Sequence, residues 1–158
     1  MKLAGIILAS ICTVGIGLYK AVYLKKEMEL MDNLLDLMKY IKSNIEYYNM
    51  PLIDIYKSYI PKKASFGDTV DEIANDGWAK TLEKNKYSYL SPQTKKLIAD
   101  YGNALGCTYK EGQLQHNGYY IGEMTKMLDE AKVYTPQRMK VYISLGVYAG
   151  LLIIILFI

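Results

Sequence analysis

Hydrophobic residues gather at the two ends of this chain, and charged residues gather between them. The stretches Leu3–Tyr19 and Val141–Ile158 contain no charged residue at all. An α-helix rises about 1.5 Å per residue, so the second stretch would extend about 27 Å, close to the hydrocarbon thickness of a bilayer, about 30 Å. The pattern predicts membrane-spanning helices at 1–24 and 136–158, on either side of a polar domain at 25–135.

Other interpretations of the apolar ends are a cleaved signal peptide and a buried core helix. Only Lys2 precedes the first stretch, and no small-residue cleavage site ends it, so we expect a retained anchor. Leu151–Ile158 is apolar on every face, which is typical of a helix in lipid rather than of a helix packed on one side.

Basic residues next to the predicted spans indicate the orientation. They lie on the side of the polar domain, whereas only Lys2 lies outside the spans. Loops rich in lysine and arginine stay in the cytoplasm, so we expect residues 25–135 to be cytoplasmic and both termini to lie across a bacterial membrane. The basic residues concerned are Lys20, Lys25, Lys26, Lys132, Arg138 and Lys140.

The polar domain begins with an apolar stripe at helical spacing. Its members recur every three or four residues, without glycine or proline, which predicts one long helix that continues from the first span. The stripe suits either a coiled-coil dimer or an intramolecular bundle, and the helices that follow favour the bundle. Its members are Leu24, Met28, Met31, Leu34 or Leu35, Met38, Ile41, Ile45 and Tyr48.

Glycine and proline divide the rest of the domain into shorter helices. Proline fits the first turn of a helix, and glycine commonly follows the last turn. We expect a kink or a new helix at Pro136, since its ring removes an interior hydrogen bond. The predicted fold is all-α, a cytoplasmic antiparallel bundle of about five or six helices flanked by the two membrane helices. The shorter helices are expected at about 52–60, 68–75, 78–84, 92–105 and 108–134.

Small residues follow one another at four-residue spacing in both predicted spans. Such residues let helices approach closely in lipid, where packing drives association. We expect these faces to make helix contacts, either within the hairpin or between subunits of a homo-oligomer. The positions are Gly5, Ala9, Thr13 and Gly17 in the first span, and Gly146 and Gly150 in the second.

The composition offers few groups for catalysis. His116 is the only histidine, so one chain cannot assemble a multi-histidine metal site, and no phosphate-binding glycine loop is present. Basic and acidic residues interleave around a net charge of +3, which argues against nucleic acid as a partner. We expect no catalytic residue, cofactor or metal. A membrane enzyme that uses Cys107 and His116 as a nucleophile pair is an alternative, as is a membrane-anchored regulatory coiled coil.

Several motifs resemble one family along the whole chain. The segment Tyr101–Gly106 resembles an aromatic-Gly-x-x-Leu-Gly motif that ends in Leu105 and Gly106, and Gln113 with His116 resembles a Q-x-x-H motif. Through these motifs the sequence resembles the stage III sporulation protein AB family of endospore-forming bacteria. Further matching positions are Pro51, Leu52, Trp78, Ser144-Leu145-Gly146 and Ala149–Leu152.

The resemblance implies a non-enzymatic platform subunit of the channel that joins mother cell and forespore, required for endospore formation. It implies a bundle similar to the F domain of type II secretion and type IV pilus platform proteins. The implied partners are a cytoplasmic ATPase (stage III sporulation protein AA), other membrane proteins of the stage III sporulation A operon, and lipid of the mother-cell membrane around the forespore. Gln113 and His116 are either functional contacts or a structural pair one helical turn apart.

Overall fold

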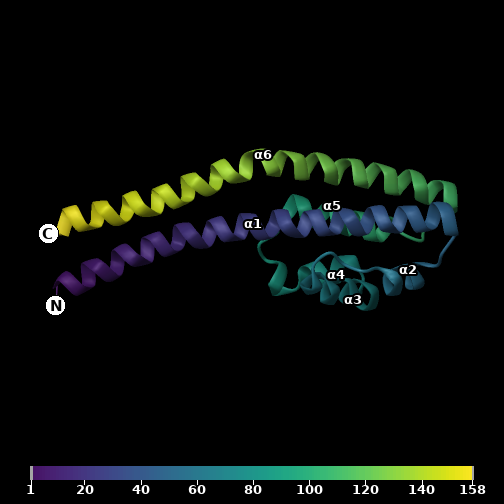
Figure 1. The fold of residues 1–158 in the computed structure, drawn as a ribbon, viewed down its shortest axis with the longest axis horizontal. Coiled ribbons are helices and arrows are strands. Elements are labelled where there is room, and N and C mark those ends of the chain that lie inside the picture. The colour runs from purple at the N-terminus through teal and green to yellow at the C-terminus, as the bar shows by residue number, and fades with distance from the viewer. Residues whose placement is uncertain (1, 158) are drawn as a thin grey trace. The chain divides into compact units, whose positions relative to one another are not determined.

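The computed structural model describes residues 2–157, apart from the side chains of residues 2–4, 6 and 7. This part of the chain contains six α-helices, two short 3₁₀ turns and no strand, so the all-α prediction is confirmed (Figure 1). The α-helices are α1 (Lys2–Tyr48), α2 (Leu52–Ser58), α3 (Gly67–Asp76), α4 (Trp78–Glu83), α5 (Pro92–Ala104) and α6 (Lys110–Phe157); the 3₁₀ turns are η1 (Ala64–Phe66) and η2 (Asn85–Tyr87).

The chain divides into two compact units. Residues Met1–Met28 and Glu130–Ile158 form one, here called the hairpin unit, and Glu29–Asp129 form the other, the bundle unit. Helices α1 and α6 contribute residues to both units. Two helical stretches, Leu8–Tyr48 and Lys110–Phe157, are long and apolar enough to cross a membrane, which agrees with the two predicted spans.

The predicted stripe on α1 forms the centre of the bundle unit. Leu34, Met38 and Ile41 have no solvent exposure, whereas Tyr48, at the end of the stripe, is 72% exposed. Burial of apolar side chains is the main stabilising contribution to such a unit. Most of the stripe is therefore covered by other residues of the same chain, and these buried side chains are not available to pair with a second copy in a coiled coil. The buried members of the stripe are Met31, Leu34, Leu35, Met38, Ile41 and Ile45.

The turn residues act where the sequence predicts them. The Ser91 hydroxyl accepts a hydrogen bond from the Thr94 amide at 3.2 Å and caps α5, which begins at Pro92. Gly77 and Gly106 have φ angles of 84° and 80°, values that glycine adopts without the steric cost of a side chain. They separate α3 from α4 and end α5, so these helix boundaries are set by local chemistry.

Trp78 joins three helices of the bundle unit. Its ring meets the Tyr101 ring of α5 edge-on, with centroids 5.0 Å apart, and its Nε1 donates a 2.8 Å hydrogen bond to the Tyr56 hydroxyl of α2. Gly102 lies so close that a Cβ there would overlap the Cβ and ring of Trp78. Burial raises the pKa of Tyr101 well above its usual value, so this side chain packs as a neutral phenol.

At Pro136, where the sequence predicts a kink or a new helix, no new helix begins. Helix α6 continues through Pro136 from Lys110 to Phe157. A proline removes one backbone hydrogen bond, but the regular turns on both sides remain, and long membrane helices tolerate such a loss. The last span is therefore the end of a helix that begins in the bundle unit.

We expect Gly102→Ala to destabilise the protein and Gly122→Ala to leave it unchanged or stabilise it. A Cβ at position 102 would overlap Trp78, an overpacking that costs about 1–3 kcal/mol. A Cβ at position 122 meets no described residue within 4 Å, and alanine is preferred over glycine in a helix by about 0.5–1 kcal/mol. Denaturant unfolding of the full chain in micelles, followed through the fluorescence of its single tryptophan, measures both. Equal stability of the two variants would contradict the contact.

Candidate functional site

Glycines bring the two helices of the hairpin unit into backbone contact. A Cβ on Gly17 would lie 2.5 Å from the carbonyl oxygen of Tyr142, and a Cβ on Gly146 would lie 2.9 Å from the carbonyl oxygen of Thr13. Gly17 and Gly146 are both buried. A larger side chain at either position would force the helices apart, so the absence of side chains permits this packing.

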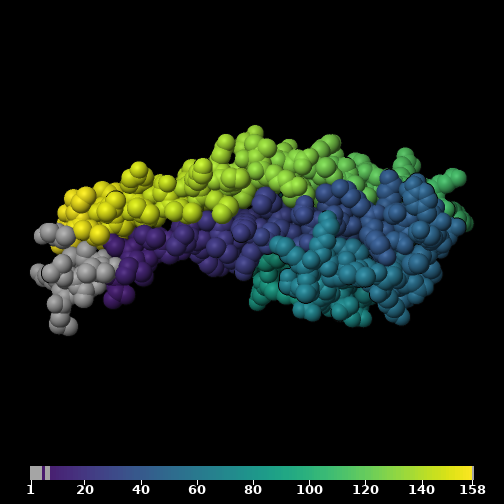
Figure 2. Space-filling view, in the orientation of Figure 1, coloured from purple at the N-terminus to yellow at the C-terminus, as the bar shows by residue number. Residues whose placement is uncertain are grey.

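A hydrogen bond joins the same two helices beside the glycines. The buried Ser10 hydroxyl donates to the carbonyl oxygen of Gly150 at 2.7 Å. The Thr13 hydroxyl donates to the Ser10 carbonyl oxygen at 2.8 Å and lies 3.1 Å from the Cβ position of Gly150. Where water cannot reach a backbone carbonyl, a hydroxyl that donates a hydrogen bond to it in addition to the helix amide stabilises it. Figure 2 shows α1 and α6 packed side by side along this contact.

Two of the predicted packing positions lie off this contact: no described residue approaches within 4 Å of a Cβ on Gly5, and Ala9 is exposed. The family-motif positions Ser144 and Leu145 are exposed too. Each four-residue step overshoots a helical turn by about 40°, so a strict spacing of four drifts around the helix. The contact instead follows Ser10, Thr13 and Gly17, with one step of three residues and one of four. Ser10 is missed by the sequence pattern for this reason, although its small polar side chain is a signal.

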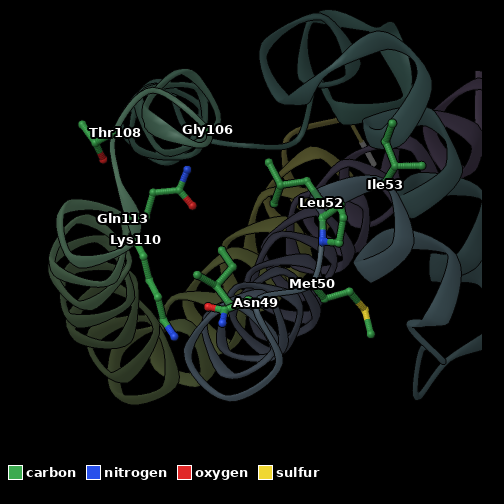
Figure 3. A pocket seen from close by; sticks show the side chains of 10 residues that line it. Asn49, Met50, Leu52, Ile53, Gly106, Thr108, Lys110 and Gln113 are labelled. Carbon is green, nitrogen blue, oxygen red and sulfur yellow. The ribbon is translucent and has the colours of Figure 1, made fainter.

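The bundle unit has an open pocket of about 450 Å³ (Figure 3). Four of the predicted family-motif positions line it: Pro51, Leu52, Gly106 and Gln113. Gly106 forms one wall, and a Cβ there would lie 3.8 Å from the Leu52 Cδ1. The pocket therefore brings together the end of α1, the start of α2, the turn after α5 and the start of α6. The remaining lining residues are Ile45, Asn49, Met50, Ile53, Thr108 and Lys110.

Polar side chains without protein partners surround the pocket. Within the described part of the chain, the side chains of Asn49, Thr108, Lys110 and Gln113 make no hydrogen bond or ion pair. Figure 3 shows the Gln113 amide directed toward Leu52. Binding sites commonly combine an apolar floor with a few polar groups that are free to bind. Sequence reasoning missed Asn49, Thr108 and Lys110, since each lies two or three residues from a motif position without belonging to the motif.

The other motif positions lie away from the pocket. Trp78 is buried among α2, α4 and α5, while Leu105 is half-buried. His116 is exposed, and no hydrogen bond joins it to Gln113 among the described residues. Of that predicted pair, only Gln113 faces the pocket.

Cys107 and His116 do not form a nucleophile pair within the described part of the chain. Both side chains are exposed, and the Cys107 thiol donates to the Asn103 carbonyl oxygen at 3.0 Å. A thiol attack needs a base within hydrogen-bond reach of the sulfur. The described residues also contain no group of three histidine, cysteine, aspartate or glutamate side chains that could hold a metal ion.

The ion pairs of the bundle unit tie its short helices together outside the pocket. Glu72 on α3 binds Lys86 and also Lys84, the latter at 3.2 Å, and Asp76 binds Lys84 at 2.8 Å. The hydrogen bond from Lys86 is the largest of the effects that lower the pKa of Glu72, and the hydrogen bond from Lys84 lowers that of Asp76. These pairs are largely exposed, so their role is to orient α3 and α4 rather than to supply chemistry.

Comparison with known proteins gives one family. The family model described as stage III sporulation protein AB matches residues 2–158, the length of the described chain and one residue more. No curated protein and no solved structure matches the chain.

We expect Ser10→Cys with Gly150→Cys to form a disulfide within one chain, in a background with Cys12 and Cys107 changed to serine. The Cβ position of residue 150 lies 3.7 Å from the Ser10 Cα, so the two thiols can reach each other. The protein is oxidised in membranes, and non-reducing gels then show whether the disulfide has formed and whether it lies within one chain.

The control pair is Ser10→Cys with Leu145→Cys, because Leu145 is 59% exposed and lies off the contact. This pair should stay reduced. Linked dimers in place of a linked monomer from the first pair would mean that the glycine face joins two subunits, which contradicts the hairpin.

Proposed function

This chain belongs to the stage III sporulation protein AB family, and from that premise we propose that it is a non-enzymatic membrane platform of the sporulation channel. In this proposal the hairpin unit holds the protein in the mother-cell membrane around the forespore. The bundle unit lies in the cytoplasm, with an F-domain-like role, and receives the ATPase stage III sporulation protein AA. The family description itself supports the coarser statement, a role in stage III of sporulation.

The observation that carries the proposal is the composition of the pocket. Motif positions from separate segments, Leu52, Gly106 and Gln113, converge on one open surface of the bundle unit. Around them lie amide, hydroxyl and ammonium groups, which bind but do not form a nucleophile with its base. A surface of this kind supports a docking role rather than a catalytic one.

The two candidate spans support the membrane part of the proposal. Each span belongs to a helix that continues into the bundle unit, α1 up to Tyr48 and α6 from Lys110. Basic residues flank the spans on the bundle side, which favours a cytoplasmic bundle unit. The glycine contact between the spans supplies packing in lipid, and their outer faces remain available to other channel proteins.

We expect the purified ATPase, stage III sporulation protein AA, to bind the full-length protein in lipid nanodiscs. Docking on the bundle unit should give saturable retention at least about tenfold above that on empty nanodiscs, and retention should fall at high salt where ion pairs contribute. Retention of the ATPase is measured on nanodiscs immobilised on a sensor surface. Absence of binding over a range of salt concentrations, with both proteins folded, would count against the platform.

A further inference from the structure

The floor of the pocket is apolar and open to solvent. Ile45 is buried beneath it, Leu52 is half-buried in its wall, and Ile53 at its rim is 65% exposed. Gly106 lies opposite Leu52 and has no side chain to fill the pocket, and its φ of 80° disfavours any other residue there. Exposed apolar surface that is hollowed and rimmed by polar groups is typical of a binding site.

The rim of the pocket carries one charge, and that charge is positive. Lys110 is the only charged residue among those that line the pocket, and within the described chain its ammonium group has no carboxylate partner. Lys110 is also the first residue of α6, whose unpaired first amides add partial positive charge. Glu46, Asp54 and Glu111 are close in the chain to lining residues but do not line the pocket.

These features together define the occupant. An inorganic anion would use Lys110 and leave the apolar floor exposed, whereas an apolar chain alone would leave the Lys110 ammonium without a partner. A peptide with an apolar side chain next to a carboxylate satisfies both groups, and its main chain can exchange hydrogen bonds with the Gln113 amide. Figure 3 shows the Gln113 amide directed from α6 toward Leu52.

We propose that this pocket binds an acidic, apolar peptide segment of a cytoplasmic partner protein. The apolar side chain packs on Ile45 and Leu52, and the neighbouring carboxylate pairs with the Lys110 ammonium. The assignment rests on the proposed function in two respects, which are that the bundle unit is cytoplasmic and that the partner is the ATPase. The peptide chemistry follows from the pocket alone.

Two short peptides test the pocket directly. They have equal length and the same leucines, with aspartates at the other positions in one peptide and lysines in the second. Binding to the full-length protein in micelles is followed by fluorescence anisotropy of labelled peptide, and by the NMR signals of Gly106 and the Gln113 side chain. We expect the aspartate peptide to bind at least about tenfold tighter than the lysine peptide and to move these signals.

Charge reversal at Lys110 gives the decisive comparison. Lys110→Glu should weaken binding of the aspartate peptide at least about tenfold and make the lysine peptide the tighter ligand. The variant should fold, because glutamate in the first turn of α6 suits the helix dipole. Lys96→Glu is the matched control, since Lys96 is exposed on α5 and does not line the pocket, and it should change nothing. Equal binding of the two peptides, or equal effects of the two substitutions, would overturn the proposal.

The same variants separate this proposal from the platform role. If the ATPase binds the wild-type protein and Lys110→Glu equally well, the pocket assignment to that partner fails and the platform stands. If the aspartate peptide binds the pocket while the ATPase binds no form of the protein, the pocket stands and the platform fails. Far-UV circular dichroism of each variant establishes that it is folded.

Discussion

The close approach of Trp78 to Gly102 is the contact on which the bundle unit depends. Because Gly102 has no side chain, the indole of Trp78 can lie against α5 and still reach the Tyr56 hydroxyl of α2. Tyr56 lies one turn after Leu52, and Gly102 lies one turn before Gly106. The indole thus fixes the two helices whose ends form opposite walls of the pocket, and the surface chemistry of the protein follows from a packing constraint in its core.

The hairpin unit, which contains the two candidate membrane spans, packs by the same rule. Gly17 and Gly146 remove side chains where two backbones meet, and the Ser10 hydroxyl supplies a donor to the Gly150 carbonyl oxygen in the same contact. In water, burial of apolar area would drive such packing, but in lipid the close fit itself must do so. Small residues therefore define the contacts of both units. In the bundle unit a glycine lies against a large aromatic ring, and in the hairpin unit glycines lie against backbone.

Much of the fold was predictable because it follows from local chemistry. The features that depend on contacts between distant segments were not predictable. Ser91 with Pro92, Gly77 and Gly106 mark helix boundaries through capping and positive φ, which act within a few residues. The helix through Pro136 was not predictable, because the neighbouring turns offset the missing hydrogen bond. The pocket was predictable only at its motif positions; Lys110 carries no local signature, and its role appears once α6 begins beside Leu52.

The nuclear Overhauser effect between the Trp78 indole and the Gly102 α protons tests the central contact most directly. It is measured on the full-length protein in micelles, with selectively labelled tryptophan and glycine, and the single tryptophan makes the assignment unambiguous. The structure predicts a strong effect, because the Cβ position of Gly102 falls within 2.8 Å of the Trp78 Cδ1. A folded protein with a well-resolved indole signal and no effect to Gly102 would contradict this account of the bundle and its pocket.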